Sequence, residues 1–398
     1  NTAYLLERLS QTLERLETLM AIFVSNRYLP RRILLLTGCF ARAAAERHSI
    51  SRLWKQSSGL MARSVTQNAG DHGEHYITRD KREYWVMFYS AAGGGVLIAL
   101  MALFKTYLGS IIDDKVWKGV AEGLNYGLGF MVIFMLHFTV ATKQPAMTAA
   151  RFAEAVEKTP QGKTVNMKLA QLLVDVFRSQ SIAVLGNVLI AMGLAALIAF
   201  GYQYKTGEPL MNADQIAYQL HSIDPFAGTL WFAAIAGVWL FCSGIISGYF
   251  DNRSNYLNMR MRLAQHPLLK KLMSEKTRVK FANYMHENYG SLIGNLCFGM
   301  LLGITGVVGY LTHLPLDIRH VAFSSANVGY IAVSGQFTYS LLLQCIGFVL
   351  LIGLVNLIVS FSLTLWVALR SLNAEIDSWW PIWHEVCQIV RKRPLSLF

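Results

Sequence analysis

Charged residues are scarce in this 398-residue sequence, at 15%, whereas hydrophobic residues make up 54%. This composition is too apolar for an ordinary soluble domain and is typical of a membrane protein with water-exposed parts. The sequence also lacks an initiating methionine and the basic-apolar-small pattern of a signal peptide. We therefore expect it to be part of a longer protein.

The five cysteines form no CxxC pair and have no metal-ligand spacing. This argues against a disulfide framework and against a zinc site, so we expect buried or reduced thiols. The stretch Asp71-His72-Gly73-Glu74-His75 holds two histidines with acids nearby. Because no second ligand pair accompanies them, we list His75 only as a candidate binding residue and predict no metal and no cofactor.

Six apolar segments are each long enough to cross a bilayer, which takes about 20 helical residues. They lie at about 85–108, 119–142, 182–202, 226–250, 291–311 and 339–369. The sequence therefore predicts an all-α fold, a polytopic membrane protein with six transmembrane helices. The expected regions are a cytoplasmic helical region at 1–84, a transmembrane domain at 85–369 and a cytoplasmic amphipathic tail at 370–398.

Basic residues are distributed unevenly between the two sides of these spans. Of the 36 Lys and Arg residues, only five fall on the side of the first, third and fifth connections. They are Lys105, Lys115, Lys118, Lys205 and Arg319. Because basic loops stay in the cytoplasm, we predict that both termini are cytoplasmic. The same asymmetry explains the net charge of +12 without nucleic acid, which we do not expect as a partner.

The two ends of the chain carry patterns typical of helices that contact other surfaces. Apolar residues at heptad spacing predict an N-terminal helix that packs on a partner helix. They are Leu6, Leu9, Leu13, Leu16, Met20 and Phe23. In the tail, Trp379, Trp380 and Trp383 precede the basic run 391–393, which is typical of an anchor at the lipid interface. Membrane lipids and a protein bound to the N-terminal helices are therefore the expected partners.

Polar residues inside the spans are candidate functional residues. They are Asn125, His137, Asn187, Asn295, Gln344 and Asn356. No Asp or Glu lies at the centre of a span, so His137 is the one candidate for a titrating group at depth. The alternative is interhelical hydrogen bonding, and the glycine pairs at four-residue spacing, such as Gly123/Gly127, predict close helix packing. The run 93–95 of three glycines predicts a hinge, a kink or a very close helix contact.

The sequence ATKQPAM predicts a turn after the second span, because the residue before a proline disfavours helix. Pro145 would then open the next helix, and Lys143 and Gln144 would lie beside its N-terminus as a candidate anion site. The alternative for Lys143 is an interfacial lysine whose ammonium reaches the membrane surface.

The connection 312–338 contains the apolar run HVAFSSANVGYIAVSG, which is too short to span a membrane. One interpretation is a re-entrant or surface-lying segment, which requires protein or water to satisfy its backbone. The alternative is an outer β-hairpin or a loop packed on the helix ends.

The runs GEHYITRDKREYW, LNYGLGFMVIFMLHFTVATKQPAMTAA and LDIRHVAFSSANVGY resemble those of a bacterial membrane-protein family labelled "site-specific recombinase" (gonococcal Gcr type). The resemblance extends from about Gly73 to the C-terminus, and ATKQPAMTAA is its most specific part. The sequence has no His-x-x-Arg motif, and its N-terminal region is predicted to be helical. We therefore assign no catalytic residues.

Three functions are consistent with these patterns. The first is a non-enzymatic role in transport or envelope organisation, indicated by six spans with polar residues. The second is DNA recombination or DNA binding, which the resemblance implies. The third is a membrane scaffold that uses its N-terminal helices.

Overall fold

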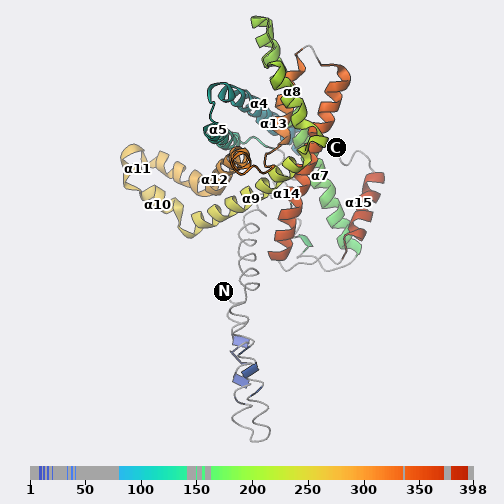
Figure 1. Cartoon of the computed structure of the whole chain (residues 1–398). Helices are drawn as coiled ribbons and strands as arrows, with labels where there is room; N and C mark the ends of the chain where they lie inside the picture. Colours follow the sequence, from blue (N-terminus) through green and yellow to red (C-terminus); the bar gives the residue numbers. More distant parts are fainter. Residues whose placement is uncertain are drawn as a thin grey trace. The chain divides into compact units, whose positions relative to one another are not determined.

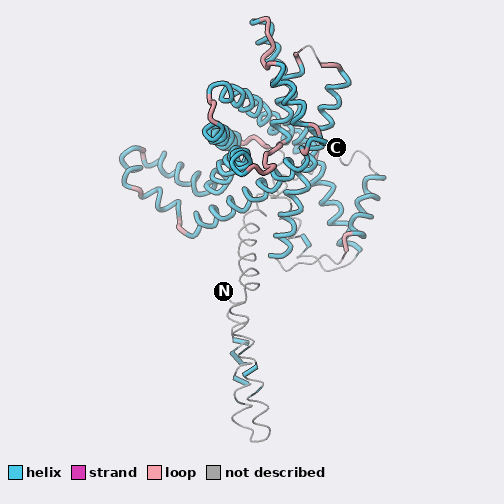
Figure 2. The backbone as a smooth tube through the Cα atoms, viewed as in Figure 1, coloured by secondary structure: helices cyan, strands magenta, loops and turns pink. Residues whose placement is uncertain are grey.

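The computed structural model describes residues 80–140, 163–334, 337–371 and 378–392, and isolated positions elsewhere. Within these residues the chain consists of helices and loops without a strand (Figure 2). The all-α prediction is therefore confirmed for the described part. Contacts divide the chain into two units, Asn1–Gly59 and Leu60–Phe398. In the first unit, the described heptad positions Leu9, Leu13, Leu16 and Met20 are helical and their side chains are exposed.

Five helices of the second unit are long and apolar enough to cross a membrane. They are α4 (Lys81–Ile111), α7 (Lys163–Thr206), α9 (Thr229–Tyr256), α12 (Glu275–Thr312) and α14 (Tyr339–Ser371). These helices coincide with five of the six predicted spans, so the chain has the helices of a membrane protein. The shorter described helices are α8 (Ala213–Ile223), η3 (Pro225–Ala227), α10 (Met259–Gln265), α11 (Pro267–Leu272), α13 (Val321–Ala332) and α15 (Trp380–Lys392). Figure 1 shows α10 and α11 between the distal ends of α9 and α12.

The second predicted span, 119–142, is not among those five helices. It corresponds to α5 (Lys115–Met135), which begins and ends earlier than predicted. The helix ends because His137 adopts a left-handed conformation with φ of 57°. The backbone N–H of Thr139 then donates to the Ser90 carbonyl of α4 at 3.2 Å. The predicted end at 142 was therefore wrong, since α4 satisfies backbone groups that we had assigned to a continuing helix.

The three consecutive glycines of α4 allow this non-helical segment and α7 to approach its backbone. A Cβ atom on Gly94 would overlap the carbonyl of Thr139, and one on Gly95 would lie 2.9 Å from the carbonyl oxygen of Asn187. Real Cβ atoms are essentially never found so close to a neighbouring atom. The prediction of a very close contact at this glycine run is confirmed.

The spanning helices form two halves that repeat one hydrogen-bonded arrangement. In the first half α4 packs along α7, and Asn187 Nδ2 of α7 donates to the Ala91 carbonyl at 2.5 Å. In the second half α9 packs along α14, and Asn356 Nδ2 of α14 donates to the Ala233 carbonyl at 2.7 Å. Each amide also holds a non-helical segment, because Asn187 donates to the Thr139 carbonyl and Asn356 to that of Arg319.

The same correspondence is visible in the sequence and in the backbone. Four residues of α4 have identical counterparts at the same spacing in α9. They are Ala91, Ala92, Gly95 and Val96 in α4, and Ala233, Ala234, Gly237 and Val238 in α9. A Cβ on Gly237 would lie 3.1 Å from the Asn356 carbonyl, as one on Gly95 would lie 2.9 Å from that of Asn187. We therefore match α4 with α9, α5 with α12, and α7 with α14.

The matched helices α5 and α12 cross in opposite directions through facing glycines. Gly303 contacts the Gly123 backbone, and Gly299, earlier in α12, contacts the later Gly127 of α5. The packing role predicted for these glycine pairs is confirmed. Each helix is followed by a left-handed histidine, His137 with φ of 57° and His313 with φ of 55°. Because the matched helices α5 and α12 run in opposite directions, the two halves form an inverted repeat.

The connection between α12 and α14 contains α13, a helix buried along nearly its whole length. Its first N–H, that of Val321, donates to Asn356 Oδ1 midway along α14 at 3.2 Å. The Tyr330 hydroxyl donates to the Ala99 carbonyl of α4 at 2.7 Å. The alternative of a β-hairpin in this connection was therefore wrong. A neighbouring helix therefore satisfies the first backbone N–H of α13, which is part of the condition that a re-entrant segment must meet.

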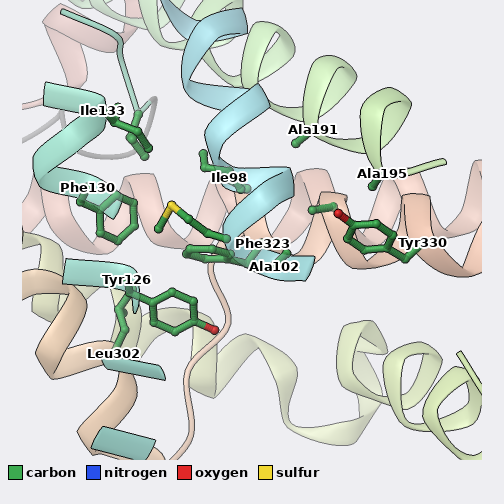
Figure 3. Close-up of a cluster of buried hydrophobic side chains, with 14 of the residues drawn as sticks. Ile98, Ala102, Tyr126, Phe130, Ile133, Ala191, Ala195, Leu302, Phe323 and Tyr330 are labelled. Atoms are coloured by element: carbon green, nitrogen blue, oxygen red, sulfur yellow. The ribbon is translucent and has the colours of Figure 1, made fainter. Parts of the chain in front are cut away.

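The largest core cluster joins both halves, as Figure 3 shows for its labelled members. Phe323 of α13 packs on Tyr126 of α5, with ring centroids 4.4 Å apart. Phe130 of α5 packs on Phe298 of α12 at 5.1 Å. This aromatic core fixes α13 against the crossing of α5 and α12.

Candidate functional site

A polar cavity of about 460 Å³ lies where the two halves meet. Its walls come from α4 and α5 of the first half, the segment 317–320 and α13 of the second, and α8 between them. Six charged side chains line it: Lys105, Lys118, Glu122, Asp214, Asp317 and Arg319. Three cations and three anions from four parts of the chain therefore share one cavity.

Lys105 and Glu122 form an ion pair between α4 and α5 in this cavity. Their Nζ and Oε2 atoms are 3.4 Å apart, and 13% of the Glu122 side chain is exposed. The Lys105 ammonium also lies 5.7 Å from the ring centroid of Tyr126, within reach of a cation–π interaction. The cavity wall between α4 and α5 thus carries a carboxylate that is already neutralised.

Arg319 is held by several contacts at once. Its Nη1 donates to Asp317 Oδ2 at 2.6 Å and to the Ile318 carbonyl at 2.8 Å, while Nε donates to the Ser222 carbonyl at 2.8 Å. Its guanidinium also lies 5.4 Å from the ring centroid of Phe232. This network fixes the non-helical segment before α13, and Arg319 at the same time lines the cavity.

Lys118 differs from these two cations, since it has no ion-pair partner among the described residues. Its side chain is partly buried and lies across Gly109 of α4, where an added Cβ would be 3.0 Å from Nζ. Lys115, one turn earlier on α5, instead places its ammonium 4.2 Å from the Tyr310 ring centroid, away from the cavity lining. Lys118 is therefore an unneutralised positive charge held at the cavity wall.

Two predicted site residues make hydrogen bonds between elements of the described part of the chain. Asn125 Nδ2 donates to the Met101 carbonyl of α4 at 2.9 Å, which is the interhelical bond that the alternative interpretation predicted. His137 is exposed and ends α5, and its carbonyl accepts a bond from the Ser90 hydroxyl at 3.0 Å. Neither residue lines the cavity.

The remaining predicted site residues, Lys143, Gln144, Pro145 and His75, lie outside the described residues. Among those that are described, no group of three His, Cys, Asp or Glu side chains could hold a metal ion. The described cysteines Cys242, Cys297, Cys345 and Cys387 are free thiols.

The polar residues inside the predicted spans did not indicate the position of the cavity, but the few basic residues on the sparsely charged side did. Three of the five basic residues on the sparsely charged side, Lys105, Lys118 and Arg319, line this one cavity. Lys105 and Lys118 lie on the consecutive helices α4 and α5, whereas Arg319 lies about 200 residues later, so only the packing of the two halves brings all three together. Glu122 was missed because it lies near one end of a predicted span, not at its centre.

A second, apolar groove of about 540 Å³ lies between α7 and α15. Its lining includes Leu173 and Phe177 of α7 and Trp383 and Val386 of α15. The buried Ile382 joins α15 to a small core cluster with α7. The tail helix therefore packs on the bundle through Ile382, while the side chains of Trp380 and Trp383 remain largely exposed.

Comparison with known proteins found one match. A family model described as "Site-specific recombinase" matches residues 1–398, whereas no curated protein and no solved structure matches the chain. The sequence resemblance noted from Gly73 onward is thus confirmed and extends over the whole chain. Because the match covers all 398 residues, this chain belongs to the family described as site-specific recombinase.

Proposed function

We propose that this protein transports a small polar solute across the bacterial inner membrane. The observation that carries the proposal is the inverted repeat, whose two halves enclose a charged cavity at their junction. Many transporters are built from inverted repeats, with the binding site between the repeats and beside interrupted helices. Here non-helical segments follow His137 and His313, and each is held by the amide of an asparagine in the third helix of its half.

Six spans are part of this proposal, with α5 as the sixth. At about 1.5 Å per residue, its 21 residues are long enough for a hydrocarbon core of about 30 Å. An inverted repeat of three spans per half also requires it, because three crossings return the second half in the opposite direction.

The orientation follows from the basic residues and supports a cavity open to the outside. Both termini and the N-terminal helical region are then cytoplasmic, and the cavity-lining α8 belongs to an outward connection. A periplasm-active reporter fused after Lys163 should be silent, and one fused after Glu208 should be active. The reverse pattern would overturn the orientation and place the cavity on the cytoplasmic side.

The transport proposal can be tested with purified protein in liposomes. We expect saturable uptake of at least one labelled solute from a panel of phosphate, succinate, glutamate and choline, compared with protein-free liposomes. Replacement of Ser324, which lines the cavity, by cysteine adds an accessibility test. A transporter of this kind opens its binding site to each side of the membrane in turn. Labelling of that cysteine by an impermeant maleimide from one side only, under all solute conditions, would contradict such a mechanism.

DNA recombination is a second candidate, because the family carries that description. Exposed basic residues also cluster on α10, α11 and the start of α12. They are Arg260, Arg262, Lys270, Lys271, Lys276 and Lys280. This candidate predicts DNA binding that weakens steeply with added salt. The absence of any binding at about 50 mM salt would rule it out.

A further inference from the structure

We infer that the cavity binds its solute through an anionic group, a carboxylate or a phosphate, with the Lys118 ammonium as the principal contact. The inference deepens the proposed transport function, because it names the chemistry of the solute. It rests on the charged side chains of the cavity, some of which are paired with an opposite charge and some of which are not. Binding and transport can be measured separately, so each statement can fail alone.

The acids of the cavity interior are already engaged. Glu122 lies 3.4 Å from the Lys105 ammonium, and Asp317 accepts from Arg319 at 2.6 Å. A cationic solute would have to compete with these built-in cations for each carboxylate. The third acid, Asp214, is exposed in the first turn of α8, where water solvates it.

The cations of the cavity are not all engaged. Lys118 is partly buried and has no ion-pair partner within the described residues. Arg319 Nε and Nη1 are used in hydrogen bonds, but Nη2 has none that involves the described part of the chain. Because the guanidinium is held on its other side, Nη2 needs little reordering to donate to a bound oxygen.

The tip of the Lys118 side chain lies beside Gly109 of α4. The glycine at position 109 leaves room for the lysine tip, since a Cβ there would lie 3.0 Å from Nζ and 3.3 Å from Cε. Hydrogen bonds from a charged donor are stronger than neutral ones, so a partly buried ammonium without an ion-pair partner is suited to bind an anion.

The rest of the lining supplies neutral donors and acceptors for a small, multiply polar solute. Asn212, Gln215 and Gln219 come from α8 and its N-cap, and Asn327 comes from α13. The volume of about 460 Å³ falls in the range of small-molecule sites, about 300 to 1,000 Å³. The cavity therefore fits a short carboxylate or a phosphate compound and excludes a macromolecule.

The experiment measures equilibrium binding to the full chain in nanodiscs. The probes are succinate, inorganic phosphate and a short-chain phosphatidylglycerol, with choline as the cationic comparison. We expect at least one anionic probe to bind, and Lys118→Gln to weaken that binding about tenfold through loss of a charged hydrogen bond. Lys118→Arg should retain binding. The matched control is Lys115→Gln, which removes a cation from the same helix but outside the cavity and should leave affinity unchanged.

Several results would overturn the inference. They are binding of choline but of no anion, binding of no probe at all, or equal losses in Lys118→Gln and Lys115→Gln. If Lys118→Gln does not fold, Asp214→Asn decides, because this exposed change removes a negative charge from the cavity rim. Anion binding should then tighten about twofold, the size of a surface charge effect, whereas weaker binding would contradict an anion site. Anion binding without uptake into liposomes would support the site and reject transport.

Discussion

The two halves of the bundle share their backbone supports and differ in their charges. Asn187 and Asn356 occupy equivalent places, and each joins the first and third helices of its half to a non-helical segment. Lys105 and Glu122 have no charged counterparts in the second half. In the match of α4 with α9, Lys105 corresponds to Ser247, and in the match of α5 with α12, Glu122 corresponds to Phe298. The repeated residues hold the frame, and the residues that differ line the cavity.

This difference separates architecture from function. An amide buried between helices satisfies carbonyls that would otherwise cost free energy, and both halves need that in the same place. A charged group inside a membrane span is costly unless it is paired or functional. The charges of the first half are therefore the difference between the halves that points to function. We expect the repeated asparagines to affect folding and the unmatched charges to affect binding.

The largest expected effect breaks the contact between the halves. Gly299→Leu would drive a side chain into the backbone of Gly127, where α5 and α12 cross. Overpacking of this kind typically costs about 1–3 kcal/mol and more where backbone opposes backbone, so we expect most folded protein to be lost. The measurement is the yield of monodisperse protein in size-exclusion chromatography, together with its melting temperature.

The control for this change is Gly193→Leu, since a Cβ at Gly193 on α7 would meet nothing within 4 Å. It should fold normally. Equal tolerance of both leucines would show that α5 and α12 do not cross as described.

The next effect tests whether the halves are equivalent. Asn356→Leu removes hydrogen bonds to Ala233, Arg319 and Val321, and leaves buried backbone groups unsatisfied. We expect a destabilisation of about 1–3 kcal/mol, with a similar loss for Asn187→Leu. Thermal melting in detergent would measure both.

Asn125→Leu serves as the comparison, because its single bond from a partly buried amide should contribute only about 0.6 kcal/mol. If Asn187→Leu destabilised the protein as little as Asn125→Leu while Asn356→Leu destabilised it strongly, the buried asparagines would not have equivalent roles in the two halves.

The smallest effect on stability should come from the unmatched charges. Glu122→Gln removes the ion pair with Lys105, whose side chain is 40% exposed, so solvent screens the interaction. Such a pair contributes at most about 1 kcal/mol, and a double-mutant cycle with Lys105→Met should give a coupling energy no larger. A loss as large as that of Asn356→Leu would show that these charges support the fold.

The spans were predictable because hydropathy and length report directly on membrane-crossing helices. The end of α5 was not, because nothing in the residues before His137 distinguishes a continuing helix from one whose next carbonyls and amides bond to α4. The glycine pairs correctly predicted close packing, but not that Gly299 would face Gly127. The repeat was also missed, since the identities shared by α4 and α9 are few and consist of small, common residues.

The sequence by itself determined the all-helical class and predicted six apolar spans, five of which coincide with helices able to cross a membrane. These properties depend on composition and on the order of neighbouring residues, both of which can be read directly from the sequence. Only the tertiary structure decided that Asn187 and Asn356 are equivalent, and that Lys105, Lys118 and Arg319 line one cavity. The reason is physical: those residues meet through the packing of helices far apart in sequence, and no local pattern encodes which helices become neighbours.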